Sequence, residues 1–179
     1  LNNNSFNIIN TKNARSLGAE IELRKKLDFI NSLKNFTVSG NISYVNSNVK
    51  DSTGNVNRPL QGQSPYLVNA NLQYDHAKAG FTATLLFNQI GRRILFVGNE
   101  AIPNIWEAPR PLFDLQLAKK LLKTRGELKL NISDLLNKTA RFYHDIDNNK
   151  RYSSDSKDVL AITRQYGTTF SLSFSYNIK

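Results

Sequence analysis

The residues best suited to chemistry gather in one polar segment of the chain, around His144. Histidine nitrogen and carboxylate oxygen atoms bind zinc, but a zinc site needs three or four such ligands that converge on one point. The chain has two histidines, His76 and His144, and no cysteine. His76 lies in a short turn far along the sequence from His144, so we predict no zinc site.

The same segment begins like a calcium-binding loop. Asp145, Asp147 and Asn149 have the D-x-D-x-N spacing with which an EF-hand starts. The pattern then fails, because Lys150 stands where the loop requires glycine and Ser156 where it requires a bidentate glutamate. The sequence therefore favours a solvated polar loop, and we predict no metal ion.

No other group of residues has the pattern of an enzyme active site. The sequence holds no G-x-S-x-G motif and no glycine loop that would cradle a phosphate. Glu20 and Glu22 lie two residues apart on one expected strand, which is the wrong geometry for a catalytic pair and suits contacts inside a pore. We predict no catalytic residue, no cofactor and no enzymatic activity.

Composition excludes several classes of protein. The chain has 179 residues, and its 24 Lys and Arg against 14 Asp and Glu give a formal charge of +10. The cations are scattered and carry no nucleic-acid-binding motif, so we predict no nucleic-acid partner. No stretch approaches the ~18–20 continuous apolar residues of a membrane helix. Because methionine and a signal-peptide pattern are absent, we expect a chain that was processed or cut from a longer one.

The strongest signal is a period of two residues. Side chains of a strand point alternately to its two faces, and residues 170–178 alternate between apolar and polar. The same alternation recurs in other runs: 17–24, 36–44, 66–75, 81–88, 113–118 and 128–133. A shorter segment, 6–9, resembles the end of one more strand. The sequence thus predicts seven strands and a partial one.

The connections between these strands alternate in length. Short links at 28–35, 75–80 and 122–126 separate long ones at 49–65, 91–109 and 135–164. Transmembrane barrels have this alternation, with short periplasmic turns and long extracellular loops. Several runs also reach the ~9–11 residues that a membrane-crossing strand needs. We therefore predict an all-β fold, an antiparallel transmembrane β-barrel segment.

The two faces of the expected strands suit lipid on one side and a polar lumen on the other. The polar faces carry Ser, Thr, Asn and Gln, whereas sheets exposed to water carry more Lys and Glu. Such small side chains would not fill a narrow barrel, so we expect part of a larger one. Aromatic residues near the strand ends suit an interfacial girdle, although ordinary strand propensity would also place them there: Phe36, Tyr44, Tyr66, Tyr74, Phe81, Phe113 and Tyr176.

Several short motifs resemble those of TonB-dependent outer-membrane receptors of the Bacteroidetes type. A late strand of that barrel is similar to residues 58–72 (RPLQGQSPYLVNANL). The next loop and strand are similar to residues 91–94 (GRRI), 107–110 (EAPR) and 113–115 (FDL), and the penultimate strand to residues 130–137 (LNISDLLN). The closing strand after Tyr166-Gly167 resembles the end of the barrel. In order and spacing, these motifs cover nearly the whole chain.

The resemblance implies a 22-stranded barrel in the bacterial outer membrane, of which residues 1–179 supply about the last eight strands as part of one barrel domain. It implies a plug domain that is absent from this chain, and an energy transducer of the TonB type that binds through the missing N-terminal region. The implied function is to bind a scarce ligand outside the cell and import it with energy from the inner membrane. Further implied partners are outer-membrane lipid, lipopolysaccharide and a surface lipoprotein. The chain departs from the family at its end, Ile178-Lys179, where a terminal aromatic is usual.

The long loops are the expected place for ligand capture, because binding residues concentrate on loops that a rigid scaffold carries. Aromatic residues beside arginines suit anionic or ring-bearing ligands. The apolar 91–109 loop could equally pack on itself. We predict ligand-binding candidates in these loops: Phe96, Trp106, Arg141, Tyr143, His144, Arg151 and Tyr152.

Two other functions remain open from the sequence. A free-standing eight-stranded outer-membrane barrel would have a structural or adhesive role, and a soluble barrel of the lipocalin sort would bind a small molecule in its core. A plug domain upstream would favour the receptor. These residues do not say whether the ligand is a siderophore, cobalamin, a glycan or a peptide.

Overall fold

The computed structural model describes residues 13–50, 57–99, 102–155 and 157–178. Apart from three short 3-10 turns, every regular element in these residues is a strand. Among them, no helix is long and apolar enough to cross a membrane. The segment 6–9, for which we predict a partial strand, lies outside the described residues.

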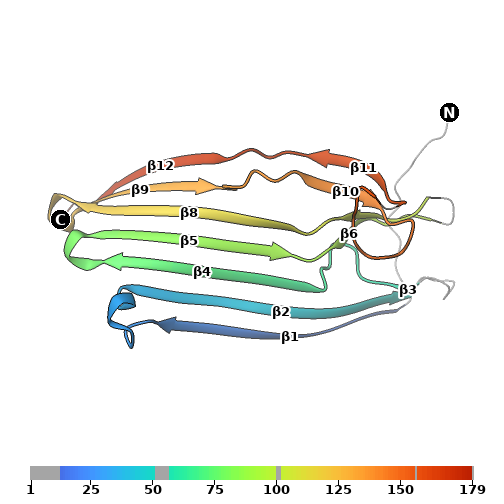
Figure 1. Ribbon diagram of the computed structural model, residues 1–179, viewed down its shortest axis with the longest axis horizontal. Coiled ribbons are helices and arrows are strands. Elements are labelled where there is room, and N and C mark those ends of the chain that lie inside the picture. The colour runs from blue at the N-terminus through green and yellow to red at the C-terminus, as the bar shows by residue number, and fades with distance from the viewer. Residues whose placement is uncertain (1–12, 51–56, 100–101, 156, 179) are drawn as a thin grey trace.

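Seven long strands form one antiparallel sheet, in which each pairs with the next long strand along the chain (Figure 1). A short strand, β3 (Asn57–Arg58), pairs with the end of the second long strand. All seven predicted strands are present, and the predicted all-β antiparallel fold is confirmed: β1 Asn13–Lys26, β2 Phe36–Lys50, β4 Tyr66–His76, β5 Phe81–Ile90, β8 Arg110–Leu121, β9 Gly126–Ser133 and β12 Thr169–Tyr176.

The first two strands are longer than the side-chain pattern indicates. β1 begins at Asn13 rather than near residue 17, and β2 continues to Lys50 rather than to residue 44. Residues 45–50 lose most of the apolar alternation, but the pairing with β1 continues until Lys50 lies opposite Asn13. Backbone hydrogen bonds do not need an apolar face, so a ladder can extend beyond the band that the side chains mark.

Short turns join the strands at one end of the sheet, and the long connections lie at the other (Figure 1). The turns are η1 (Asn31–Leu33), η2 (Ala77–Ala79) and η3 (Leu122–Thr124). After η2, Gly80 has a φ of 58°, a left-handed conformation that glycine adopts without steric cost. Its carbonyl then accepts a hydrogen bond of 2.7 Å from the Lys120 N–H, which ties this turn to β8. The predicted alternation of short and long connections is confirmed.

The strand register gathers apolar side chains on one face of the sheet. Leu85 lies opposite Leu115, and Leu130 lies opposite Leu172. These side chains have no protein layer over them, and Leu172 on the last strand is 68 % exposed. The polar side chains occupy the other face, as the two-residue period predicts.

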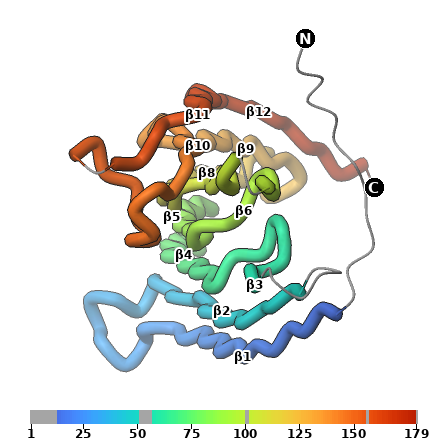
Figure 2. Tube along the Cα trace, turned by 90° about the vertical axis from the view of Figure 1, so that its right-hand side faces the viewer, coloured from blue at the N-terminus to red at the C-terminus, as the bar shows by residue number. Residues whose placement is uncertain are grey.

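The sheet is curved, and its polar face lies inside the curve. Viewed from the end with the long connections, the strands follow an arc from β1 to β12, with β3 and the connecting strand β6 (Arg93–Phe96) within it (Figure 2). The polar face is hollowed by a groove of about 430 Å³ that crosses β1, β2, β4, β5 and β8. Among the described strands, β1 and β12 are the two edges and do not pair with each other. The described part of the chain is therefore an open arc rather than a closed ring.

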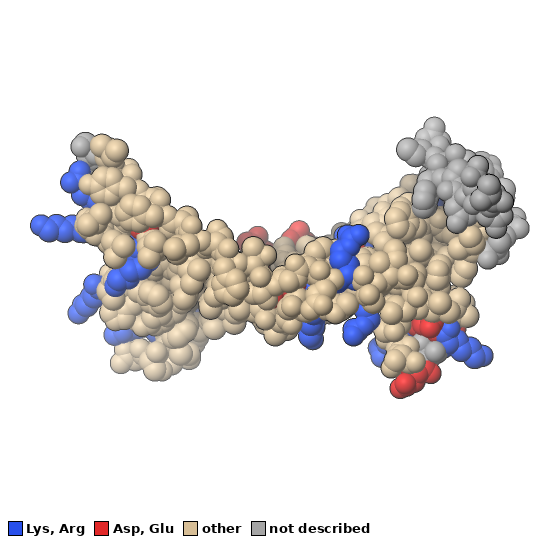
Figure 3. Space-filling view, turned by 90° about the horizontal axis from the view of Figure 1, so that it is seen from above, with Lys and Arg blue, Asp and Glu red and all other residues tan. Residues whose placement is uncertain are grey.

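Most of the Lys and Arg side chains seen from above gather toward the two ends of the strands. They lie at the turn end and again toward the long connections, and a few Asp and Glu side chains lie between these two groups (Figure 3). The turn end carries Lys119, Lys120, Lys123 and Arg125. Cations near both ends of the strands suit a sheet that spans an apolar layer.

The two long connections after β5 and β9 contain a second, four-stranded sheet, which we call the cap sheet. Its strand order is β11-β10-β7-β6, so strands from both connections pair. Loops were expected here, but the connections carry most of the buried apolar core, including Ile94, Ala140, Phe142 and Tyr143. The cap strands are β6, β7 (Ile105–Glu107), β10 (Ala140–His144) and β11 (Val159–Arg164).

Candidate functional site

The cap sheet joins the two long connections through β7 and β10. Trp106 on β7 lies opposite Tyr143 on β10. The first connection leaves β5 at Gly91, where a Cβ atom would lie 2.7 Å from the Tyr66 ring and 2.8 Å from the Ser64 hydroxyl. Only glycine fits that approach, and its N–H donates to the Tyr66 carbonyl at 3.0 Å. Gly91 therefore sets the point at which the chain turns from the long sheet into the cap.

Arg92 is a largely buried residue that connects two segments of the cap. Its Nη1 lies 2.5 Å from Oδ2 of Asp145, and the two side chains are only 15 % and 3 % exposed. Its guanidinium carbon also lies 3.9 Å from the centre of the Trp106 ring. One cation thus contacts an acid from the second connection and an aromatic ring from the first. A buried pair of this kind is strong only while both partners are present.

Tyr143 lies at the centre of the cap. It has no exposed surface, and its ring centre is 5.4 Å from that of Tyr152. Burial raises the pKa of the Tyr143 hydroxyl above its ordinary value, and the neighbouring Arg92 opposes that rise. The hydroxyl is therefore neutral at physiological pH, and it finds no hydrogen-bond partner among the described residues.

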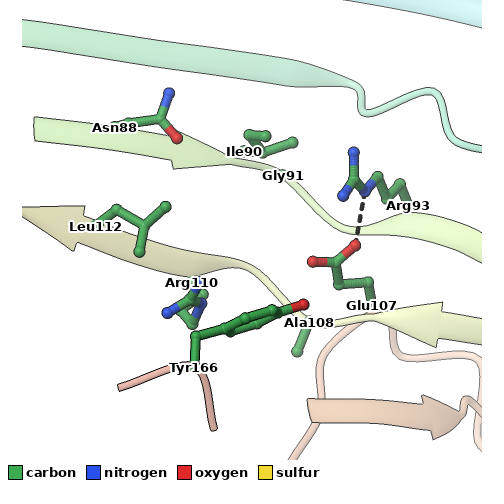
Figure 4. A pocket seen from close by; sticks show the side chains of 9 residues that line it. All are labelled: Asn88, Ile90, Gly91, Arg93, Glu107, Ala108, Arg110, Leu112 and Tyr166. Atoms are coloured by element: carbon green, nitrogen blue, oxygen red, sulfur yellow. Dashed lines mark hydrogen bonds and ion pairs between the residues drawn. The ribbon is translucent and has the colours of Figure 1, made fainter. Parts of the chain in front are cut away.

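A second set of ion pairs lies where the cap meets the long sheet. Arg93 Nε is 2.7 Å from Glu107 Oε2, and Arg110 Nη1 is 2.6 Å from Asp134 Oδ2. The Arg110 guanidinium also lies 5.1 Å from the centre of the Tyr166 ring. Figure 4 shows Arg93, Glu107, Arg110 and Tyr166 around a pocket of about 180 Å³, which Asn88 on the polar face also lines.

A row of amides leads across the polar face to that pocket. Asn88 donates to Asn69 at 2.5 Å, and Asn69 donates to Asn41 at 2.7 Å. Asn41 in turn donates to the Glu20 carboxylate on β1. The row crosses four neighbouring strands, and Asn69 and Asn41 each both donate and accept. The sheet therefore has a fixed, hydrogen-bonded inner surface at this level, and Glu20 contributes a charge to it.

Most of the predicted ligand-binding residues lie in the cap. Phe96 ends β6, Trp106 is on β7, and Arg141, Tyr143 and His144 are on β10. His144 Nδ1 lies 3.0 Å from the Pro103 carbonyl oxygen, which joins the two connections again. Of the aromatic candidates, Tyr143 is buried and Phe96 is exposed.

The remaining candidates lie on the segment between β10 and β11. Tyr152 packs back on the cap, with the Arg141 guanidinium carbon 5.9 Å from its ring centre. Arg151 is exposed, and its N–H donates to Asn149 within the same segment at 2.7 Å. The structure thus brings Trp106, Arg141, Tyr143 and Tyr152 together around one cap, and no contact among the described residues joins Arg151 to them.

A second pocket has residues of both the long sheet and the cap in its lining. It has a volume of about 300 Å³, and Tyr44, Gln63, Arg92, Trp106 and Lys150 are among the residues that line it. Two cations beside an aromatic ring form a surface that would attract an anionic or ring-bearing molecule. Among the described residues that line this pocket, none is a histidine, cysteine, aspartate or glutamate.

Sequence reasoning did not single out Arg92, Arg93 or Arg110 as site residues. Arg92, Arg93 and Arg110 each make an ion pair in or below the cap. A usable signal was present, because adjacent arginines followed by Trp106 in an apolar connection require acidic partners. Those partners come from distant segments, so the pattern could indicate that partners exist but not which ones.

One acidic cluster could hold a metal ion. Oxygen atoms of Asp145, Asp147 and Asp158 lie within 4.8 Å of one another, beside the end of β10. In the part of the chain that the structure describes, it is the one group of three or more acidic or metal-binding side chains that meets this spacing.

Comparison with known proteins gives one match. A sequence profile described as the Outer membrane protein beta-barrel family matches residues 2–176. The matched range includes all seven long strands and both connections that form the cap sheet. No curated protein and no solved structure matches the chain.

Proposed function

The chain belongs to the outer membrane protein beta-barrel family, and from that premise we propose that it is part of a receptor barrel that captures a scarce ligand and imports it. The protein lies in the bacterial outer membrane, and barrels of its family are typically not enzymes. The apolar face of the sheet is then the face that meets lipid, and the cationic turns lie at a membrane surface rich in phosphate.

The observation that carries the proposal is the hollow polar face beneath a folded cap. A small barrel fills its interior with its own side chains. Here the inner face carries short amides that bind one another, Asn41, Asn69 and Asn88, and a groove of about 430 Å³ remains above them. An inner surface of this kind suits a wide lumen that holds water or a plug domain.

The open edges of the sheet support the same proposal. β1 and β12 do not pair with each other in the described structure, and an unpaired strand in a membrane leaves its backbone groups without partners. Further strands of a larger barrel would satisfy both edges. A TonB-type transducer, a plug domain and a surface lipoprotein are then the partners to test.

Cross-linking of the edges separates a large barrel from a small one. We expect no cross-link between cysteine at Leu172 and cysteine at Leu17, Ile21 or Leu23, using a reagent that spans ~10 Å, two strand spacings. The chain has no native cysteine, so the reaction is specific within it. Leu130 lies opposite Leu172 and provides the positive control. A cross-link from β12 to β1 in outer-membrane fractions would instead identify a closed barrel of about eight strands.

Ligand capture is tested by removing the contact between Arg141 and Tyr152 in the cap. We expect Arg141→Ala with Tyr152→Ala to lower uptake about tenfold, the equivalent of ~1.4 kcal/mol of lost contact. The strain is grown with one limiting nutrient at a time: iron with a siderophore, cobalamin, a glycan or a peptide. Removal of the energy transducer should produce the same growth defect.

Arg125→Ala is the matched control, because its guanidinium lies 5.7 Å from the Tyr176 ring at the turn end, where no ligand arrives from outside. Surface abundance of each variant is measured in parallel. If deletion of the whole gene slows growth on none of these nutrients, the transport proposal fails. If the gene deletion slows growth but the double variant grows normally, the transport proposal is supported and the ligand is not captured by Arg141 and Tyr152.

A further inference from the structure

Three aspartates meet where the hairpin of β10 and β11 opens. Asp145 directly follows β10, Asp158 directly precedes β11, and Asp147 lies two residues beyond Asp145. One carboxylate oxygen from each lies within 4.8 Å of the others. Two ligands of one calcium ion lie at most ~5 Å apart, because each calcium–oxygen distance is ~2.3–2.6 Å. The three oxygens are therefore close enough to share one ion.

Two further observations point into this cluster. Oδ1 of Asp145 and the hydroxyl of Tyr143 are both buried, and neither has a hydrogen-bond partner among the described residues. The Asp145 side chain is 3 % exposed, and Arg92 occupies its other oxygen, Oδ2. Tyr143 is fully buried, and Arg92, Asp145 and Asp158 all lie near enough to act on its hydroxyl by charge. Leaving a buried oxygen unpaired is costly, and a cation beside Oδ1 would remove that cost.

The local charge matches a divalent cation. Three carboxylates contribute −3 and the Arg92 guanidinium contributes +1, so the cluster with its ion-pair partner has a charge of about −2. Oxygen-only ligands select calcium or magnesium over zinc. His144 is adjacent in sequence, but its Nδ1 lies against the Pro103 carbonyl oxygen at 3.0 Å. Carboxylates from an irregular loop favour calcium, because magnesium demands near-ideal octahedral geometry.

We infer that the cap binds a calcium ion through Asp145, Asp147 and Asp158. The ion ties the two ends of the segment between β10 and β11 together, at the point where Arg92 already fastens that segment to Trp106. The EF-hand comparison missed the site because the third carboxylate is Asp158 and not residue 156. The site does not depend on the proposed transport function.

The intervening segment provides a direct readout. Lys150, Arg151 and Lys157 are exposed, and all three lie between Asp147 and Asp158 in sequence. Trypsin can cleave after each of them, and a cation that ties the ends of the segment should slow that cleavage. The full-length protein is purified in detergent, stripped with a chelator, and digested with calcium alone or magnesium alone. Mass spectrometry follows the three cleavages.

We expect calcium at ~10 mM to slow these cleavages about tenfold, since extracellular calcium sites have dissociation constants up to ~1 mM. Magnesium at the same concentration should protect much less. Asp147→Asn should abolish the protection. Asp147 is exposed, and the hydrogen bonds that its carboxylate accepts among the described residues come from the backbone and side-chain amides of Asn149. The Asp147→Asn variant should therefore still fold.

Asp155→Asn is the matched control, because Asp155 is an exposed acid of the same segment outside the cluster. It should keep the full calcium effect. Cleavage without calcium reports folding, and it should be equal in both variants and the wild type. The inference is overturned if calcium does not slow cleavage of the wild type, if magnesium protects equally, or if Asp147→Asn is protected as well as Asp155→Asn.

Discussion

Arginine at position 172 is expected to destabilise the barrel by about 2–4 kcal/mol, the cost of a cation at the middle of the lipid face. Leu172 lies on the apolar face, opposite Leu130 and near the middle of β12. The guanidinium would have to leave water for hydrocarbon, and its partner on β9, Leu130, is apolar. The loss is measured as the free energy of unfolding of the full-length protein in lipid vesicles, with the folded fraction read on unheated gels.

Ser171→Arg is the control for this prediction. Ser171 is adjacent to Leu172, points to the polar face and lies opposite the neutral Asn131. Ser173 also points inward, but Lys129 lies opposite it and would repel a second cation. We expect Ser171→Arg to cost well under ~1 kcal/mol, because its charge stays in a polar lumen. Equal losses from Leu172→Arg and Ser171→Arg would show that the two faces are assigned wrongly.

Removal of Arg92 is expected to loosen the cap while the long sheet stays folded. Arg92→Leu leaves Asp145 buried without its counter-charge, and breaking a buried pair in this way costs ~3–5 kcal/mol. The contact with the Trp106 ring is lost as well. Amide hydrogen exchange, measured in a chelator, should speed up in β7 and β10 and stay unchanged in β4 and β5.

Arg93 offers a matched comparison one residue away. Its pair with Glu107 is more open to water, with the side chains 37 % and 23 % exposed, and such pairs contribute ~0–1 kcal/mol. Arg93→Leu should therefore change exchange in the cap much less than Arg92→Leu. Adding Asp145→Asn to Arg92→Leu should restore part of the loss, because the buried charge is then gone. Similar exchange in the two single variants would mean that the Arg92 pair does not hold the cap.

The long sheet was predictable because the side-chain pattern of each strand identifies that strand without information from its neighbours. Lipid and lumen sort side chains by a period of two, so the apolar positions of β12 identify it as a membrane strand without knowledge of its partners. Short turns then pair β1 with β2, β4 with β5, and β8 with β9, and the alternation of short and long connections predicts that these hairpins follow one another in chain order. Seven strands, their order and their two faces follow from that local pattern. The pairing of residues 45–50 with β1 could not be predicted in this way, because backbone hydrogen bonds form there without alternating apolar and polar side chains.

The cap was decided only by the tertiary structure. β7 and β10 come from separate connections, and the pairing of Trp106 with Tyr143 depends on where Gly91 and the long sheet deliver the two segments. Neither strand is long enough to show a period. The partner of Arg92 is likewise distant in sequence: it is Asp145, 53 residues further along the chain.

The candidate metal cluster shows the same limit at closer range. Asp145 and Asp147 form a recognisable start, but Asp158 joins them only because β10 and β11 run antiparallel and bring the two ends of their connection together. Sequence determined what each strand faces, since that depends on the residue and its solvent. Which charges and rings meet across the cap depends on distances set by the folded chain, and no local pattern encodes them.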